Sequence, residues 1–194
     1  MSEPVVVGVL VGNPRPASRT LNAALALRAA VRQSLSERGR RVAEDGPLVD
    51  AAELAAEVFA PGGDRVRAAL AELATADVLV VASPTYKATY TGLLKAVLDQ
   101  APGGWLTGTV AVPLLVAASD RHALAVELHL RPLLVELGAI VPGRGVFLNE
   151  SVLGGDLDAL AASLVEQLDG AGTSAALSAL TSDAGSTEKV GVGQ

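Results

Sequence analysis

A stretch of residues suited to binding a phosphate group follows the first apolar run of the sequence. The run Val5–Val11 leads directly into GNPRPASRTLN, which spans Gly12 to Asn22. Two arginines and two hydroxyl side chains lie in this stretch, namely Arg15, Ser18, Arg19 and Thr20. Where a helix follows a strand, its first turn carries unpaired N–H groups and a partial positive charge. The stretch therefore predicts either a phosphate site or an ordinary helix cap flanked by solvated arginines.

The glycines of this region do not fit two common nucleotide-binding motifs. A P-loop requires a Gly-Lys pair near its end, and GNPRPASRTLN contains none. A dinucleotide fingerprint requires G-x-G-x-x-G, and the spacing of Gly8 and Gly12 does not match it. A terminal phosphate monoester is a dianion that can use both the arginines and the hydroxyls.

A second candidate loop, SPTYKATY, spans Ser83 to Tyr90 and follows the apolar run VLVVA. It holds both tyrosines of the chain. A proline-containing loop at the end of a strand exposes backbone N–H groups that could pair with a flat heterocycle. The alternative is that the two tyrosines only pack against a neighbouring element.

A third candidate loop, VAASD, spans Val116 to Asp120 and ends another apolar run. The small side chains of Ala117, Ala118 and Ser119 would let a planar ring lie close to the backbone. Taken alone, ordinary packing of small residues is the simpler interpretation of this loop.

The elements that would position these loops alternate between strand and helix patterns. Five segments are predicted as strands: Val5–Val11, Pro47–Leu54, Asp77–Pro84, Thr109–Ser119 and Gly145–Asn149. Five are predicted as helices: Ser18–Arg38, Gly63–Ala76, Thr91–Gln100, Arg121–Ala139 and Asp156–Leu168. The alternation predicts an α/β fold in which helices cover both faces of a doubly wound parallel sheet.

In a flavodoxin-like sheet of strand order 2-1-3-4-5, the three candidate loops end neighbouring strands. Ligands of such sheets bind at the carboxyl ends of the strands, near the point where the strand order reverses. One loop suits a phosphate and two can flank a planar ring, so the combination predicts a site for flavin mononucleotide (FMN).

Composition restricts the remaining possibilities. Residues 1–169 of the 194 are predicted to form one domain, followed by a mobile Gly/Ser/Ala-rich tail over residues 170–194. The net charge of -6 argues against nucleic acid as a partner. No apolar run reaches the roughly 18 residues of a membrane span, so a cytoplasmic protein without a membrane partner is expected. No metal site is expected, because His122 and His129 have no third ligand in view.

Two features of the helices bear on shape and assembly. Pro132 lies inside the predicted helix Arg121–Ala139, so this helix should kink or form a π-bulge around Leu128–Arg131. On the helix Thr91–Gln100, Leu94 and Leu98 are expected to point partly away from the sheet. Uncovered apolar side chains of this kind favour a dimer or a tetramer.

Three stretches together resemble the NAD(P)H-dependent FMN reductases of flavodoxin-like fold. They are GNPRPASRTLN, SPTYKATYTGLLKAVLDQ and AASDRHALAVELHLRPLLVELGA. The pattern S-P-x-Y-x-x-x-x-x-G-x-L-K-x-x-x-D is met by Ser83, Pro84, Tyr86, Gly92, Leu94, Lys95 and Asp99. The chain is most similar to the reductases that supply reduced flavin to alkanesulfonate-type monooxygenases.

The resemblance implies a role for each candidate residue. The FMN phosphate would be held by Arg15, Ser18, Arg19 and Thr20. One edge of the isoalloxazine would be lined, largely through backbone groups, by Pro84, Thr85, Tyr86 and Lys87. The other flank would be covered by Ala117, Ala118 and Ser119, where many relatives carry a Gly pair. No catalytic acid or base is expected, because a hydride passes from the nicotinamide of NAD(P)H to the flavin.

The resemblance also implies partners. The protein would be an NAD(P)H-dependent FMN reductase that passes reduced flavin to a separate flavin-dependent monooxygenase. Leu128 or His129 would make a π-turn at a tetramer interface. Two alternatives stay open: an FMN-containing quinone, azo-dye or metal-oxyanion reductase, and a flavodoxin-type electron carrier. The aromatic content of 3% disfavours the carrier, because flavodoxins shield their flavin with aromatic rings.

Overall fold

Strands and helices alternate along the chain in the computed structural model, which describes residues 3–60 and 62–183. The strands are β1 (Val7–Val11), β2 (Leu48–Asp50), β3 (Val78–Pro84), β4 (Val110–Ala117) and β5 (Val146–Asn149). They form one sheet of order β2-β1-β3-β4-β5, in which every neighbouring pair is parallel. The predicted fold class and strand order are confirmed.

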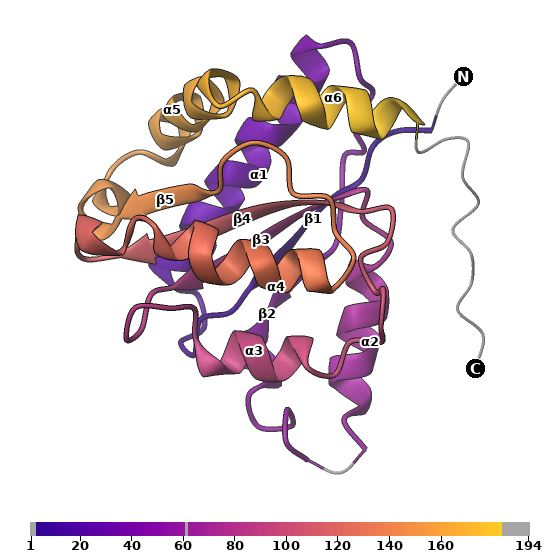
Figure 1. Ribbon diagram of the computed structural model, residues 1–194, viewed down its shortest axis with the longest axis vertical. Coiled ribbons are helices and arrows are strands. Elements are labelled where there is room, and N and C mark those ends of the chain that lie inside the picture. The colour runs from indigo at the N-terminus through magenta and orange to yellow at the C-terminus, as the bar shows by residue number, and fades with distance from the viewer. Residues whose placement is uncertain (1–2, 61, 184–194) are drawn as a thin grey trace.

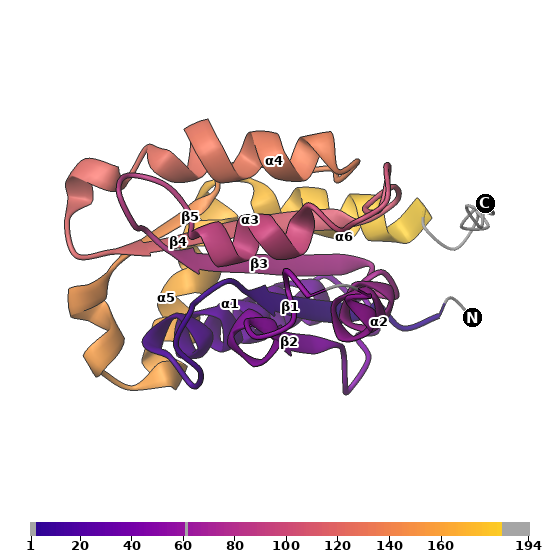
Figure 2. The ribbon, with the colours of Figure 1, turned by 90° about the horizontal axis from the view of Figure 1, so that it is seen from below.

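Helices cover both faces of this sheet (Figures 1 and 2). Those of the described chain are α1 (Arg19–Glu37), α2 (Asp64–Leu73), α3 (Gly92–Leu98), α4 (Arg131–Glu136), α5 (Leu157–Gly170) and α6 (Thr173–Asp183). One apolar core lies between the sheet and α1, α5 and α6, and the other between the sheet and α2, α3 and α4. Every residue of β1, β3 and β4 is buried, as parallel strands covered on both faces require.

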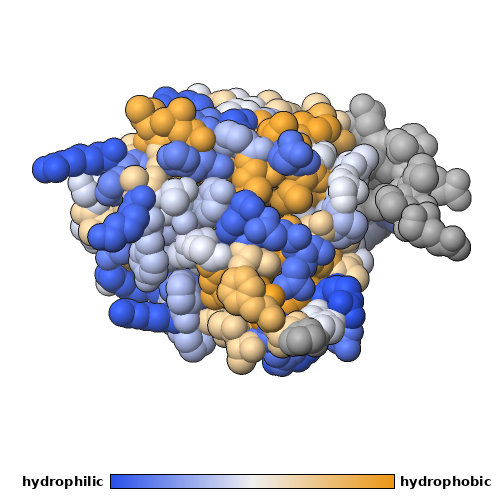
Figure 3. Space-filling model, turned by 60° about the horizontal axis from the view of Figure 1, so that its bottom comes forward, coloured by the Kyte–Doolittle hydropathy of each residue, from blue (hydrophilic) through white to orange (hydrophobic). Residues whose placement is uncertain are grey.

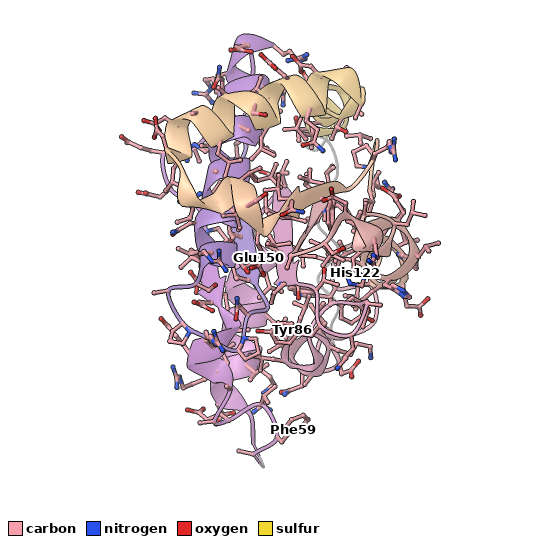
Figure 4. All side chains as sticks on the ribbon, turned by 90° about the vertical axis from the view of Figure 1, so that its left-hand side faces the viewer. Phe59, Tyr86, His122 and Glu150 are labelled. Carbon is pink, nitrogen blue, oxygen red and sulfur yellow. The ribbon has the colours of Figure 1, made fainter. Side chains whose placement is uncertain are left out.

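The register of the sheet brings the three candidate loops to one edge. Val11 at the end of β1 pairs with Ala82, and Pro84 at the end of β3 pairs with Val116. The loops that follow β1, β3 and β4 therefore start close together. They lie at the carboxyl edge of the sheet, which faces the viewer in Figure 4.

The helix predicted for Arg121–Ala139 is interrupted where proline requires it. A π-helix covers Val126–Leu130, and α4 begins at Arg131. The Arg131 N–H donates to the Val126 carbonyl, a bond that spans one residue more than in an α-helix. Pro132 lies in the first turn of α4, where a missing N–H costs no hydrogen bond. The predicted π-bulge is confirmed.

The segment after α5 differs from the predicted mobile tail. Thr173–Asp183 form α6, and Leu177 is fully buried in the core beside α1 and α5. Ser174 Oγ donates to Ser34 Oγ of α1 at 3.1 Å, and Arg40 donates to the Thr181 carbonyl. The prediction is wrong over this helix because small residues, which lack a strong apolar period, let α6 pack closely on α1. Residues 184–194 of the predicted tail lie outside the described residues.

The apolar surface also differs from the prediction. Leu94 and Leu98 of α3 are buried, because the segment after β2 covers this helix with Leu54 and Val58. These two leucines therefore offer no apolar surface for assembly. Large exposed apolar side chains lie instead mainly on other segments, among them Phe59, Leu124, Leu128 and Val135.

Candidate functional site

The β1–α1 loop begins at Gly12, where two elements approach each other closely. The Gly12 N–H donates to the Ala82 carbonyl of β3 at 2.7 Å. A side chain at Gly12 would overlap Leu94 of α3. Thr91, the N-cap of α3, donates its hydroxyl to the Gly12 carbonyl. The start of the loop is therefore fixed to both β3 and α3.

Asn13 organises the inside of this loop. The residue is buried, and its Nδ2 donates to Thr20 Oγ1 at 3.0 Å. Its Oδ1 accepts from the Arg15 N–H at 2.9 Å. Because Thr20 Oγ1 accepts the bond from Asn13, the hydroxyl proton of Thr20 can be donated to another acceptor.

The N-terminus of α1 presents hydrogen-bond donors at the end of the loop. Ser18 is its N-cap, and Ser18 Oγ accepts from the Leu21 N–H at 3.2 Å. Within residues 3–60 and 62–183, the N–H groups of Arg19 and Thr20 have no hydrogen-bond partner. The first turn of α1 contains no acidic residue. Unpaired N–H groups and the helix dipole together favour an anion at this position.

Asp50 supports the loop from the end of β2. Its carboxylate accepts from the Ala17 N–H at 3.3 Å and from the Ala52 N–H at 3.2 Å. Burial raises the pKa of Asp50, and the two backbone hydrogen bonds oppose this shift without cancelling it. Ala17 has a φ of 49°, which is uncommon for a residue with a side chain. Asp50 therefore helps to hold a strained backbone next to the α1 N-terminus.

The two arginines of the loop have different surroundings. Arg15 is exposed at the surface. Arg19 Nη2 lies 2.8 Å from Glu150 Oε2, and Glu150 begins the 3-10 turn that follows β5. One of the two predicted phosphate-binding arginines thus forms an ion pair across the edge of the sheet.

The β3–α3 loop folds into a tight turn. The Tyr86 N–H donates to the Thr89 carbonyl at 2.8 Å, and the Thr89 N–H returns to the Tyr86 carbonyl at 3.3 Å. Lys87 and Ala88 have φ angles of 52° and 70°, as in a type I′ turn. Positive φ at two consecutive non-glycine residues is a strained conformation of the kind found at ligand sites.

Fewer backbone donors face solvent here than the sequence suggested. Pro84 has no N–H, the Thr85 N–H donates to the Val116 carbonyl at 2.7 Å, and the Tyr86 N–H closes the turn. Of the four residues Pro84–Lys87, only Lys87 keeps an N–H that has no hydrogen-bond partner in the described part of the chain. Thr85 Oγ1 is buried and also has no hydrogen-bond partner. A ligand in this loop would therefore meet the Lys87 N–H. The Thr85 hydroxyl has almost no accessible surface, so a ligand would reach it only after a movement of the loop.

The loop after β4 changes from buried to exposed within a few residues. Ala117 ends β4 and is buried, Ala118 is exposed, and Ser119 caps the following 3-10 turn. Asn149 Nδ2, at the end of β5, donates to Asp120 Oδ1 at 2.8 Å. The loop is therefore tied to the end of the neighbouring strand, and it presents only small side chains before the turn.

Figure 4 looks onto the edge where these loops meet. Tyr86, His122 and Glu150 lie in the same region, although they follow three different strands. Tyr86 is 48% exposed, whereas Tyr90 packs against the core of the α2–α4 layer. The edge combines an anion-binding helix terminus with a strained turn and a loop of small residues. Such a surface can hold a planar molecule that carries a phosphate.

The sequence did not single out four of the residues that shape this edge, namely Asn13, Asp50, Thr91 and Glu150. Thr91 directly precedes a predicted helix, which is a signal for an N-cap. Asp50 and Glu150 follow other strands, so no local pattern connects them to the β1–α1 loop.

Two further observations concern other kinds of site. Among residues 3–60 and 62–183, no three His, Asp or Glu side chains gather in a way that could hold a metal ion. His122 is half-buried, and His129 is exposed on the π-helix. In the same part of the chain, every helix is too short or too polar to cross a membrane.

Comparison with known proteins gives consistent matches. Residues 5–152 match the family described as NADPH-dependent FMN reductase. An FMN reductase (NADPH) of Pseudomonas aeruginosa is 37% identical over 154 residues, which are 75% of this chain and 77% of the relative. The NADH-dependent FMN reductase SfnF of Pseudomonas fluorescens is 34% identical over 78% of this chain and 80% of its own. The structure of an oxidoreductase from Corynebacterium diphtheriae superposes with a TM-score of 0.75 at 26% identity, over 93% of this chain and 99% of that one.

Proposed function

This chain belongs to the NADPH-dependent FMN reductase family, and we propose that it passes reduced FMN to a separate flavin-dependent monooxygenase. Its reaction is the reduction of FMN by NAD(P)H. The transfer of the product to a partner is the part of the function that we infer.

The β1–α1 loop is the proposed phosphate site. The unpaired N–H groups of Arg19 and Thr20 support this assignment, as does the free hydroxyl proton of Thr20. The full set of proposed phosphate ligands is Arg15, Ser18, Arg19 and Thr20. Ser18 Oγ accepts from a backbone N–H, so its own proton is available to a phosphate oxygen.

The other two loops are proposed to hold the isoalloxazine ring. The Lys87 N–H lacks a partner, and the polar edge of the ring would supply an acceptor for it. The buried Thr85 hydroxyl would find a second acceptor there once the loop moves to admit the ring. Pro84 and Tyr86 would complete this side. Ala117, Ala118 and Ser119 would lie against the other flank, where small side chains leave room for a ring.

These groups suit hydride transfer without a dedicated acid or base. When bound, FMN supplies the ring that accepts the hydride, so the chain has to position the ring rather than react with it. The loops must hold the flavin about 3–3.5 Å from the nicotinamide and leave one face of the ring open. An N–H donor at the polar edge, such as that of Lys87, stabilises negative charge that develops there.

The scarcity of aromatic side chains at this edge is the observation that carries the transfer proposal. Tyr86 and Tyr90 are the two aromatic residues of the candidate loops, and Tyr90 packs into the core. A good aromatic stack contributes about 0.5–1.5 kcal/mol, and the loops after β1 and β4 supply none. FMN would therefore bind weakly enough to leave with its electrons.

The proposal includes a homo-oligomer in the cytoplasm, where NAD(P)H is available. Leu124, just before the π-helix, is 62% exposed, and Leu128 within it is 65% exposed. Val135 of α4 is 53% exposed. The face of the molecule in Figure 3 shows several apolar patches separated by hydrophilic residues. Apolar side chains at this density favour burial against a second copy. A monodisperse monomer by light scattering at micromolar concentration would contradict this part of the proposal.

Binding measurements test the proposed site and the proposed transfer together. Titration of the flavin-free protein with FMN, followed by flavin fluorescence, is expected to give a micromolar dissociation constant. Arg19→Ala should weaken FMN binding by roughly tenfold and leave riboflavin binding unchanged, because riboflavin lacks the phosphate. Arg32→Ala, further along the same helix, is the matched control.

Two results would contradict the proposal. Equal losses of FMN and riboflavin in Arg19→Ala would show that Arg19 does not contact the phosphate. A nanomolar dissociation constant, with FMN retained through dialysis, would replace the donor function by a reductase that keeps its flavin and reduces quinones or dyes.

A further inference from the structure

Arg19 of the proposed phosphate site is paired with a carboxylate from a distant part of the same chain. Its Nη2 lies 2.8 Å from Glu150 Oε2, and 131 positions separate the two residues. The side chains are 61% and 36% exposed, respectively. Because exposed ion pairs are screened by water and contribute little to stability, Arg19 can exchange this anion for another at small cost.

The place of Arg19 in α1 explains why it has an anionic partner. Arg19 is the first residue of the helix, where the positive end of the dipole disfavours a cation. No acidic residue of the first helical turn compensates this charge. Glu150, which directly follows β5, supplies the compensating negative charge.

Glu150 is held in position by its neighbours. Asn149, the residue before it, accepts from the Ser151 N–H at 3.0 Å and donates to Asp120 at 2.8 Å. The two hydrogen bonds of Asn149 therefore fix the backbone that carries Glu150. Figure 4 shows Glu150 and Tyr86 at the same edge of the sheet.

We propose that Glu150 competes with the FMN phosphate for Arg19 and thereby weakens the binding of FMN relative to riboflavin. The inference rests on the proposed function, since it assumes that the phosphate binds at the N-terminus of α1. Glu150 occupies the guanidinium that the phosphate would use, and its negative charge also repels the dianion. The phosphate is the same in oxidised and reduced FMN, so Glu150 shortens the residence of both. A reductase that hands its product to another enzyme benefits from this.

Replacement of the carboxylate tests the competition. Glu150→Gln keeps the size of the side chain and removes its charge. The variant should bind FMN about three- to tenfold more tightly and release it more slowly, with riboflavin binding unchanged. The matched control is Glu72→Gln, which removes the same charge from an exposed position near the end of α2, where the chain returns to the opposite edge of the sheet.

A double-mutant cycle separates competition from simple repulsion. If Glu150 acts through Arg19, the gain from Glu150→Gln should be smaller in the Arg19→Ala background. An equal gain in both backgrounds would overturn the competition, and no gain beyond that of Glu72→Gln would do the same. Failure of the proposed site gives a different result, because Arg19→Ala alone would then leave FMN binding unchanged.

Discussion

A buried hydroxyl without a partner is costly, and Thr85 has one beside the strained turn of the β3–α3 loop. In the proposed complex the loop moves to admit the flavin ring, and the polar edge of the ring accepts the proton of this hydroxyl. The same hydroxyl therefore lowers the stability of the flavin-free protein and strengthens the binding of flavin. The two effects can be measured separately.

Thr85→Val separates the effect on stability from the effect on flavin binding, because valine has nearly the same shape as threonine and no hydroxyl. We expect FMN and riboflavin binding to weaken by the same factor, about three- to tenfold, since both share the ring. The free energy of unfolding without flavin should stay constant or rise by up to about 1 kcal/mol. Thr89→Val, in the same loop, is the control for flavin binding. A loss confined to FMN would mean that Thr85 contacts the phosphate instead of the ring.

Single residues of the site could be predicted from the sequence where their own loop carried the signal. Ser18 was predicted as a cap or phosphate ligand from residues around it, and it is the N-cap of α1. Asp50 and Glu150 could not be predicted, because their contacts with Ala17 and Arg19 depend on which strands become neighbours. The ion pair of Arg19 therefore emerges only from the three-dimensional arrangement.

At the scale of elements, one carboxylate connects the π-helix to its surroundings. Glu127 of the π-helix accepts from Arg131 of α4 and from the Gly145 N–H, just before β5. Burial raises the pKa of Glu127, but the hydrogen bonds from Arg131 and Gly145, together with the positive charges of Arg131 and Arg144, outweigh it, so the net shift is downward. An acid with a lowered pKa stabilises the fold above its unfolded pKa of about 4.3, and this contribution is lost as the pH falls through the folded pKa.

Glu127→Gln is expected to lower the free energy of unfolding by about 1–2 kcal/mol at pH 7. The difference from the unchanged protein should shrink as the pH falls from the unfolded pKa of about 4.3 through the lower folded pKa, where the native carboxyl also becomes neutral. Urea unfolding across this pH range measures both effects. Glu136→Gln, at an exposed position of α4, should show neither. A difference that is independent of pH would show that the charge of Glu127 is not what stabilises the fold.

Removal of α6 tests whether the helix belongs to the folded domain. Deletion of residues 173–194 should lower the free energy of unfolding by about 2–4 kcal/mol, because Leu177 leaves the core. Deletion of residues 184–194 alone is the control, and their sequence, which lacks a core-forming pattern, predicts almost no loss. Equal stability of the two shortened proteins would contradict the role assigned to α6.

The elements could be predicted where the sequence carries a strong local pattern. The buried runs gave β1, β3 and β4 directly, because a parallel strand covered on both faces is apolar throughout. Pro132 located the π-helix through its missing N–H. α6 was missed because alanine, serine and threonine give no clear helical period, and its packing on α1 is visible only in the fold.

At the scale of the whole molecule, the sheet brings the ends of neighbouring strands together at one edge (Figure 1). The candidate site is assembled from loops that are short and poor in aromatic rings. This construction suits recognition of a phosphate and a ring without deep enclosure. We therefore expect the protein to exchange FMN rather than retain it.

The most direct test of this claim is the number of FMN molecules that one chain reduces without oxygen. The protein is mixed anaerobically with FMN in large molar excess over the chain and with NAD(P)H in excess over the FMN, and the loss of oxidised-flavin absorbance is recorded. Exchange predicts that nearly all the FMN is reduced, many molecules for each chain. Reduction that stops at about one FMN per chain, with NAD(P)H still present, would contradict it.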